Sequence, residues 1–248
     1  MSLECFDRAE SEPLLARLAD CAARRVVLTG CGAEQLAPRI RGAERVEEFE
    51  AWARGARLRL EGLAGSFLLV SIGTGTSALL VDPERVRRVG GTSLGGGTLI
   101  GLSTLLLGTR DFDRIAQLAA RGDRSRVDLT IGDIYSDGFE LPAAFTAASL
   151  AKLQPGATPD PADLAQGLMG LLGENVGRTC ALLAAEQGVE RVVFGGSCLR
   201  GNDYLANLLR GMCMAGGLEA LVLEDGEYTG AVGALQVAEA DGAREVAW

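Results

Sequence analysis

The chain has 248 residues, of which 48% are hydrophobic, enough for one compact domain or for two small ones that share a cleft. Its net charge of −9 argues against non-specific nucleic-acid binding, which needs a basic face. It contains no histidine, which excludes a Ser-His-Asp triad, a Cys-His pair and any histidine-ligated metal site, and leaves general-base chemistry to a carboxylate, lysine, cysteine or tyrosine.

Helix and strand signals alternate in the first quarter of the chain. Apolar residues at helical spacing predict a helix over 12–23, with Ser11 as its N-cap. A short buried strand is expected over 25–29 because glycines follow it, and a second helix is expected over 47–60. A strand that runs into glycines beside a helix is typical of an α/β fold.

Glycine-rich turns separate the predicted elements in the middle of the chain. Residues 66–82 predict two strands around a glycine-threonine turn, and residues 85–89 predict a third strand. Residues 90–108 (GGTSLGGGTLIGLSTLLLG) are expected to form a glycine loop that enters a helix. The next predictions are helices over 113–121 and 146–152 and a loop over 154–161.

The last third of the chain repeats the alternation. Its predicted elements are a helix over 163–187, a strand over 191–194, a helix over 202–215, a strand over 220–223 and a helix over 229–240. This order predicts an α/β architecture with a mostly parallel or mixed sheet flanked by helices. Residues 28–32 (LTGCG) and 194–197 (FGGS) are both strand ends that open into a glycine turn, an echo that suits two related halves facing each other over a cleft.

The turns at 73–77 (GTGTS) and 90–97 (GGTSLGGG) carry the strongest chemical signal. Phosphate binding needs several backbone N–H groups aimed at one place, and glycines permit the backbone conformations that aim them inward. A glycine run that feeds a helix adds the positive end of that helix. The two turns therefore predict a phosphate site, and the alternative is a tight hairpin with a close helix–strand crossing. Neither turn is a Walker A loop, because no Gly-Lys-Ser/Thr follows.

Charged residues near these turns each have a functional and a structural interpretation. Arg87 and Arg88 lie on the predicted strand between the turns, where alternation points at most one of them at a cleft. An arginine there would hold a carboxylate or phosphate, and a solvated strand edge is the alternative. Glu47, Glu48 and Glu50 form a dense acidic cluster, which is either a solvated helix face or the source of the general base.

Other polar residues are interpreted structurally. Asp123, Asp128 and Asp133 are too scattered to assign to a metal, and we expect them to be loop and cap residues. The six cysteines show no CxxC spacing, and no signal peptide is recognised, so they predict reduced, mostly buried thiols in a cytoplasmic protein. The apolar runs fall short of the roughly 20 residues that a membrane span needs.

Six segments in order, SIGTGTS, RRVGGTSLGGGTLIGL, ARGDRSRVDLTIGDIY, GENVG, RVVFGGSCLR and EYTGAVGAL, carry a family resemblance. Over about residues 28–235 the chain resembles the type II pantothenate kinases, the Fumble-like family. The resemblance implies an α/β fold of two related actin-like ATPase lobes, ribonuclease H-like, around a nucleotide cleft, as in the sugar kinases, Hsp70 and actin. The implied function is ATP-dependent phosphorylation of pantothenate to 4'-phosphopantothenate, the first step of coenzyme A biosynthesis, by a homodimer that uses ATP and Mg²⁺.

The resemblance also implies roles for single residues. Glu48 in VEEFEA would accept the proton of the pantothenate hydroxyl, with Glu47 as the fallback, and Arg88 would hold the pantothenate carboxylate. Thr74 and Ser77 would lie near the substrate and the phosphates. The implied ATP-binding residues are Thr74, Gly95, Gly96, Gly97, Thr98, Leu99, Ile100, Phe112, Gly196 and Ser197. No residue is implied for the metal.

One family motif has no counterpart in the chain. The family opens with a strand-turn-strand of the pattern D-x-G-G-T, whose aspartate engages Mg²⁺, whereas this chain begins Met1-Ser-Leu-Glu-Cys. The expectation is an N-terminally shortened first lobe over 1–65 and a second lobe over 66–248, with the final helix returning toward the first. Two alternatives stay open: a catalytically impaired, pantothenate kinase-like binding or regulatory protein, and a related kinase for another small hydroxylated acid or sugar.

Overall fold

The structure, a computed structural model, describes residues 12, 15–16, 25–60, 63–135 and 142–245. It divides the chain into two compact units, which are described separately. Unit 1 contains residues 1–65, 84–87 and 228–248, and unit 2 contains residues 66–83 and 88–227. Most of the helix expected over 12–23 lies outside the described residues.

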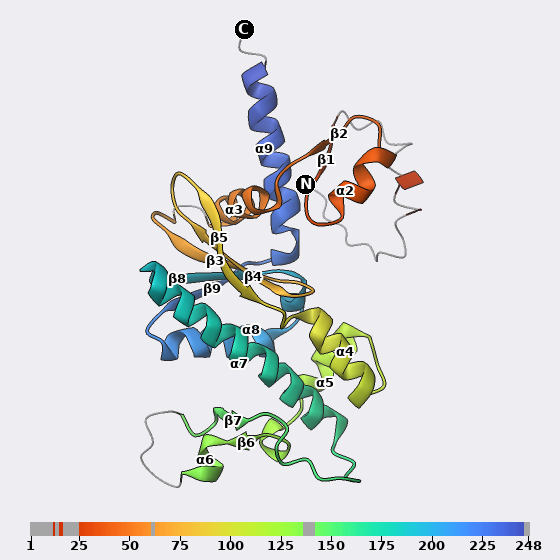
Figure 1. Cartoon of the computed structure of the whole chain (residues 1–248), viewed down its shortest axis with the longest axis vertical. Coiled ribbons are helices and arrows are strands. Elements are labelled where there is room, and N and C mark those ends of the chain that lie inside the picture. Colours follow the sequence, from red (N-terminus) through yellow and green to blue (C-terminus); the bar gives the residue numbers. More distant parts are fainter. Residues whose placement is uncertain (1–11, 13–14, 17–24, 61–62, 136–141, 246–248) are drawn as a thin grey trace. The chain divides into compact units, whose positions relative to one another are not determined.

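Unit 2 is built on a five-stranded mixed sheet in the order β5-β4-β3-β8-β9 (Figure 1). The strands are β3 (Phe67–Ile72), β4 (Thr76–Val81), β5 (Val86–Thr92), β8 (Arg191–Gly195) and β9 (Glu219–Val222). β3 pairs antiparallel with β4 and parallel with β8, and β8 pairs parallel with β9. The sequence predicted each of these strands, and the mixed sheet confirms the α/β interpretation.

The apolar sequence of the central strand β3 follows from the burial of both its faces. Leu68 and Val70 belong to the main hydrophobic core, whereas Phe67 and Leu69 on the other face of the strand are also fully buried. A strand that is covered on both faces reads as a continuous apolar run, because neither face needs polar residues. Each large side chain buried in this way contributes roughly 1.5–3 kcal/mol.

Two long helices cover one face of this sheet (Figure 1). They are α7 (Pro161–Gln187) and α8 (Asp203–Ala215), and their buried leucines pack with Leu68 and Phe194 of the sheet. Asp160 accepts the N–H of Ala162 at 2.7 Å and thereby caps α7, while Pro161 suits its first turn. The shorter α4 (Gly96–Leu106) and α5 (Phe112–Ala119) complete this layer of the core.

A small substructure next to α7 corrects one prediction. It contains η3 (Arg124–Arg126), β6 (Leu129–Thr130), α6 (Ile131–Ile134) and β7 (Thr146–Ala148), and β6 pairs antiparallel with β7. The helix predicted over 146–152 is therefore wrong. Side chains remote in sequence hold this segment in another conformation. Asp128 accepts the N–H of Leu150 at 2.7 Å, which a helix would direct to the carbonyl oxygen of residue 146, and Glu174 accepts that of Thr146 at 3.2 Å.

Unit 1 combines a parallel strand pair with two crossed helices. β1 (Val26–Leu28) pairs with β2 (Ala43–Arg45), and α2 (Ala33–Leu36) and η2 (Ala37–Arg39) lie between them in sequence. α3 (Glu48–Arg59) packs closely on α9 (Thr229–Glu245). Glycines allow this approach, since a Cβ at Gly55 would lie 1.9 Å from the carbonyl oxygen of Thr229.

Two short 3₁₀ turns follow the last strands, η4 (Ser197–Leu199) and η5 (Gly226–Tyr228). In the described part of the chain, no helix combines the length and the apolar character that crossing a membrane requires.

Candidate functional site

The two glycine turns singled out in the sequence meet in unit 2. Gly73 donates its N–H to the carbonyl oxygen of Gly75 at 2.9 Å, which closes the turn between β3 and β4. Gly96 donates to the carbonyl oxygen of Gly73 at 2.7 Å, and Gly97 donates to that of Thr74 at 2.9 Å. The N-terminus of α4 is therefore fastened directly to the β3–β4 turn.

This fastening requires glycine at the start of α4. Gly95 has an extended backbone, with φ −176°, so its conformation is open to any residue. A Cβ at Gly95 would, however, lie 2.6 Å from the carbonyl oxygen of Thr74, and one at Gly97 would lie 3.0 Å from the same oxygen. The close crossing that was the structural alternative is thus present, and it accounts for part of the glycine content.

Backbone donors nevertheless remain at this crossing. Within the described residues, no protein acceptor is found for the N–H groups of Thr74 and Gly75 in the turn, or for those of Gly95 and Thr98 at the start of α4. Donors of this kind, in a turn and at a helix N-terminus, are what an anionic group such as phosphate uses.

A third turn, which follows β8, lies beside the β3–β4 turn. β3 and β8 are parallel neighbours, so their carboxyl ends lie at the same edge of the sheet. Gly196 follows β8 with φ +110°, and a Cβ there would lie 2.4 Å from the carbonyl oxygen of Ile72. Cys198 then brings its Sγ to 3.3 Å from the carbonyl oxygen of Gly73. We call residues 73–75, 95–97 and 196–198 the turn junction.

The side chains predicted to bind ATP differ in how accessible they are. Ser197 is exposed, and Thr98 is half-buried and donates its hydroxyl to the carbonyl oxygen of Ser93 at 2.8 Å. Leu99 is 2% exposed and belongs to the hydrophobic core, with Ile100 half-buried beside it in the chain. Phe112, the first residue of α5, packs partly buried against the same core.

The residues predicted to bind the substrate lie beside Gly91. A Cβ at Gly91, whose φ is +152°, would lie 3.3 Å from the Cα of Ser77 and 2.8 Å from Nη2 of Arg88. Arg88 is exposed on β5, and Ser77 is half-buried on β4. The hairpin therefore places the guanidinium of Arg88 and the backbone of Ser77 beside the same glycine, although the two residues are separate in the sequence.

The predicted general base lies in the other unit. Glu48 is the first residue of α3 and is half-buried, while Glu50 is exposed. Glu47, the fallback, caps the helix by accepting the N–H of Glu50 at 2.9 Å. Glu48 and its fallback Glu47 thus belong to unit 1, whereas the predicted ATP- and substrate-binding residues belong to unit 2.

Sequence reasoning missed a buried polar cluster between η3 and α7. Arg124 and Glu174 form an ion pair at 2.5 Å, with each side chain only 12% exposed. Asp128 is fully buried, and burial raises its pKa above the ordinary value, although the hydrogen bond from Leu150 opposes the shift. Burial likewise raises the pKa of Tyr204. No spacing or motif relates these residues, because the tertiary contacts alone bring them together.

Asp128 lies in the loop between η3 and β6, as the sequence predicted. It is also fully buried, and its carboxylate accepts the Leu150 N–H, so it anchors the segment after β7 inside the protein. Asp123 and Asp133 do serve as caps: Asp123 accepts the N–H of Ser125 at 3.1 Å, and Asp133 accepts that of Thr130 at 2.7 Å.

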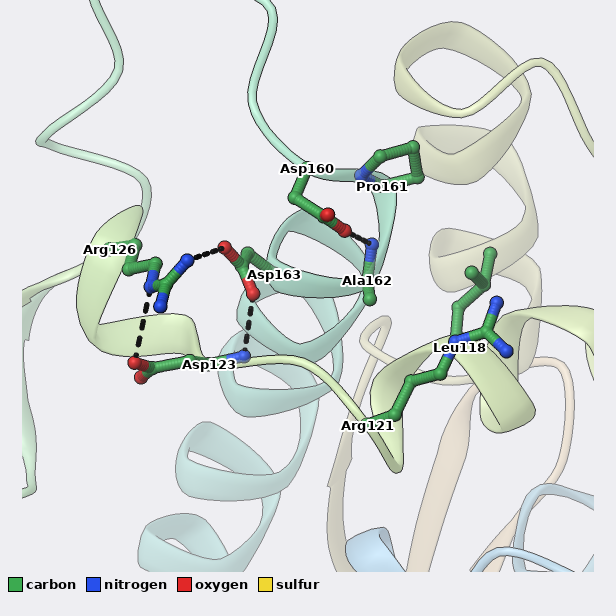
Figure 2. Close-up of a pocket in the computed structure, with 8 residues that line it drawn as sticks. All are labelled: Leu118, Arg121, Asp123, Arg126, Asp160, Pro161, Ala162 and Asp163. Carbon is green, nitrogen blue, oxygen red and sulfur yellow. Dashed lines mark hydrogen bonds and ion pairs between the residues drawn. The ribbon is translucent and has the colours of Figure 1, made fainter.

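A pocket of about 500 Å³ lies elsewhere in unit 2, at the N-terminus of α7 (Figure 2). Its carboxylates already have partners: Asp163 accepts the N–H of Asp123 at 2.7 Å and lies 3.7 Å from Arg126, and Asp160 caps α7. None of the predicted site residues lines it. Its lining residues are Leu118, Arg121, Asp123, Arg126, Asp160, Pro161, Ala162 and Asp163.

Among the described residues, no three His, Cys, Asp or Glu side chains are grouped so as to hold a metal ion.

Comparisons with known proteins give consistent relatives. A family model described as Fumble matches residues 64–237. A type II pantothenate kinase of Bacillus cereus is 32% identical over 221 residues, which cover 86% of this chain and 80% of that protein. One of Staphylococcus haemolyticus is 31% identical over 194 residues, covering 76% of this chain and 73% of that protein. A mouse 4'-phosphopantetheine phosphatase is 36% identical over 194 residues, which cover 73% of this chain but only 23% of the mouse protein.

A solved structure supports the fold class. The activator of the 2-hydroxyisocaproyl-CoA dehydratase from Clostridium difficile, with bound ADPNP, superposes with a TM-score of 0.60 over 95% of this chain and 82% of that chain. At 16% identity this likeness concerns the fold alone. It confirms the predicted α/β fold of the actin-like ATPase type.

Proposed function

Because the chain belongs to the Fumble family, we propose that it is an ATP-dependent kinase that phosphorylates pantothenate to 4'-phosphopantothenate, the first step of coenzyme A biosynthesis. The observation that carries the proposal is the turn junction, where a β-turn and the start of α4 are held together and keep backbone donors that have no acceptor among the described residues. Two relatives named type II pantothenate kinase are 32% and 31% identical to this chain over most of their own length.

The turn junction suits the phosphates of ATP, which supplies the γ-phosphoryl group. A side chain at Gly95 or Gly97 would fill the space beside Thr74, so the backbone itself forms the surface there. The N–H groups of Thr74, Gly75, Gly95 and Thr98 would donate to phosphate oxygens. The exposed hydroxyl of Ser197 would add a side-chain donor. Mg²⁺ use stays a prediction.

The substrate end of the site would use Ser77 and Arg88. A guanidinium is the side chain that best matches a carboxylate, because it offers paired N–H donors in one plane. In the proposed step, the hydroxyl oxygen of pantothenate attacks the γ-phosphorus while the bond from that phosphorus to the β,γ-bridging oxygen breaks, and ADP leaves with the bonding electron pair. Glu48 would accept the hydroxyl proton.

The alternatives are less well supported. A binding or regulatory protein without turnover is not favoured, because relatives that match over 80% and 73% of their own length are named kinases. A kinase for a different hydroxylated acid or sugar would keep the same phosphate turns and differ at Ser77 and Arg88. The homodimer and the cytoplasmic location stay predictions.

The test is an ATP-coupled assay of the full chain with pantothenate, comparing Glu48→Gln with Glu50→Gln. Both substitutions remove one carboxylate from the first turn of α3, but Glu50 is exposed. Removing a general base costs about 10²–10⁴-fold in rate, so we expect Glu48→Gln to lower kcat on that scale and Glu50→Gln to leave it within about twofold.

Three outcomes separate the claims. Absence of pantothenate phosphorylation by the wild-type chain would reject the proposed pantothenate kinase activity. Phosphorylation that Glu48→Gln leaves unchanged would reject only the base assignment. Faster phosphorylation of other hydroxylated acids or sugars than of pantothenate would favour the alternative substrate.

A further inference from the structure

The thiol of Cys198 lies where the three segments of the turn junction meet. Its Sγ is 3.3 Å from the carbonyl oxygen of Gly73, which also accepts the Gly96 N–H at 2.7 Å. A Cβ added at Gly96 would lie 2.8 Å from the same sulfur. One side chain from the β8 turn therefore contacts both the β3–β4 turn and the start of α4.

Cys198 is itself buried, and a neighbouring asparagine holds its backbone. It is 2% exposed and sits in η4 between Gly196 and α8. Asn202, which is also 2% exposed, donates its side-chain amide to the carbonyl oxygen of Cys198 at 3.1 Å. The side-chain oxygen of Asn202 accepts the N–H of Leu205 at 3.2 Å and so caps α8. The sulfur is thus anchored to the body of unit 2 through a buried amide.

The chemistry of the thiol suits a neutral donor. Burial raises the pKa of Cys198 to about 11, with the nearby Gly96 N–H acting in the opposite direction. The group therefore stays protonated at neutral pH, as a weak S–H donor that is larger than a hydroxyl. Its bulk fills the space between the turns, and its proton points to an acceptor that the glycine turn supplies.

We propose that Cys198 is a positioning residue for the nucleotide site: its thiol sets the spacing between the β3–β4 turn, the start of α4 and the β8 turn. This rests on the proposed binding of ATP at the turn junction. The thiol acts through the backbone donors that it holds in place, and it forms no covalent bond in the reaction. Its removal leaves a gap beside Gly73 and Gly96, so these two segments keep their direct hydrogen bonds but lose the side chain that connects both of them to the β8 turn.

A buried cysteine with a purely structural role is the alternative, and the chain supplies a matched control. Cys213 on α8 is fully buried in the same unit and belongs to the hydrophobic core. Cys213→Ala and Cys198→Ala make the same chemical change in equally buried positions. A general loss of packing would affect both variants alike, whereas a positioning role is specific to Cys198.

The experiment measures ADPNP binding by calorimetry, the melting temperature, and the KM values for ATP and pantothenate in the full chain. A net hydrogen bond is worth about 1 kcal/mol, or roughly fivefold in affinity. We expect Cys198→Ala to weaken ADPNP binding and raise the KM for ATP by about five- to tenfold, with the KM for pantothenate within about twofold. Cys198→Ser, which keeps a donor, should recover part of the loss. Cys213→Ala should lower the melting temperature and leave binding within about twofold.

The result can overturn the proposal in two ways. Equal effects of the two alanine variants on ADPNP affinity, or binding by Cys198→Ala within about twofold of wild type, would make Cys198 a core residue only. Absence of ADPNP binding by the wild-type chain would reject the proposed nucleotide site at the turn junction. Binding without pantothenate phosphorylation would reject the proposed reaction and still decide the role of Cys198, because affinity is measured independently of turnover.

Discussion

At the scale of single residues, the glycines of the turn junction differ in why they are needed. Gly196 has a left-handed φ of +110°, which disfavours any side chain whatever the space around it. Gly95 has ordinary extended backbone and is required only because Thr74 and Gly75 approach it. Gly101, further along α4, is in open space, because a Cβ added there would meet nothing within 4 Å.

Gly95→Ala and Gly101→Ala should therefore have opposite effects. The Cβ at residue 95 would meet backbone atoms at 2.6 Å, which forces α4 away from the β3–β4 turn, so we expect ADPNP affinity to fall at least about tenfold and the melting temperature to drop. Gly101→Ala should stabilise the exposed helix by about 0.5–1 kcal/mol and leave affinity unchanged. Calorimetry and thermal unfolding measure both. Unchanged affinity in Gly95→Ala would contradict the assignment of this crossing to the nucleotide site.

At the scale of elements, one carboxylate ties the β6–β7 substructure together. Asp133 on α6 accepts the N–H of Thr130 at 2.7 Å and pairs with Lys152 at 2.6 Å, beyond β7. Lys152 also donates to the carbonyl oxygen of Ser125 at 2.7 Å, in η3. The hydrogen bonds from Lys152 and Thr130 lower the pKa of Asp133 from 3.8 to about 2.

This shift predicts a pH dependence of stability. A carboxyl group with a depressed folded-state pKa stabilises the fold above its unfolded pKa of 3.8, and the contribution is lost as the pH falls toward 2. Asp133→Asn should therefore be less stable than wild type near neutral pH, and the difference should shrink as the pH falls from about 5 to 2. Urea midpoints measured across this range test it. Glu186→Gln, at an exposed position on α7, is the control and should show no such convergence, whereas a constant gap for Asp133→Asn would contradict the role of the pair.

At the scale of the whole molecule, the predicted functional residues are shared between two units. Glu48 belongs to unit 1, and the turn junction, Ser77 and Arg88 belong to unit 2. The contacts proposed for the nucleotide phosphates are all in unit 2, and the proposed general base is not among them. Nucleotide binding and turnover can be separated experimentally for this reason.

Hydrogen exchange with and without ADPNP should show this division. A ligand held by backbone N–H groups slows their exchange, so we expect protection in peptides that span 70–100 and 194–200. Peptides over 129–135 and 142–148, which contain β6 and β7, should be unaffected. Protection at 118–126 and 160–163 instead would place the nucleotide in the pocket at the N-terminus of α7, contrary to the proposal.

The sequence supported much of the fold because the predicted elements are locally consistent. Continuous apolar runs with glycine ends predicted β3, β4 and β8, and helical periodicity predicted α7 from residue 163. The helix begins at Pro161 instead, because Asp160 and Pro161, which the prediction assigned to a loop, form its cap and first turn. The helix over 146–152 was predicted wrongly, because Glu174 and Asp128 take backbone N–H groups there from distant positions. β2 was missed, since Ala43–Arg45 is short and carries two charged residues.

The sequence by itself determined the family, the alternation of strands and helices, and the two glycine turns, because all of these depend on the local order and spacing of residues along the chain. The tertiary structure decided what the glycines contact. It showed that Gly96 donates its N–H to the carbonyl oxygen of Gly73 and that Gly97 donates to that of Thr74. Cys198, 125 residues after Gly73, donates to the same oxygen of Gly73. Close approach depends on which backbones the sheet brings together, and parallel pairing of β3 with β8 placed these turns at one edge.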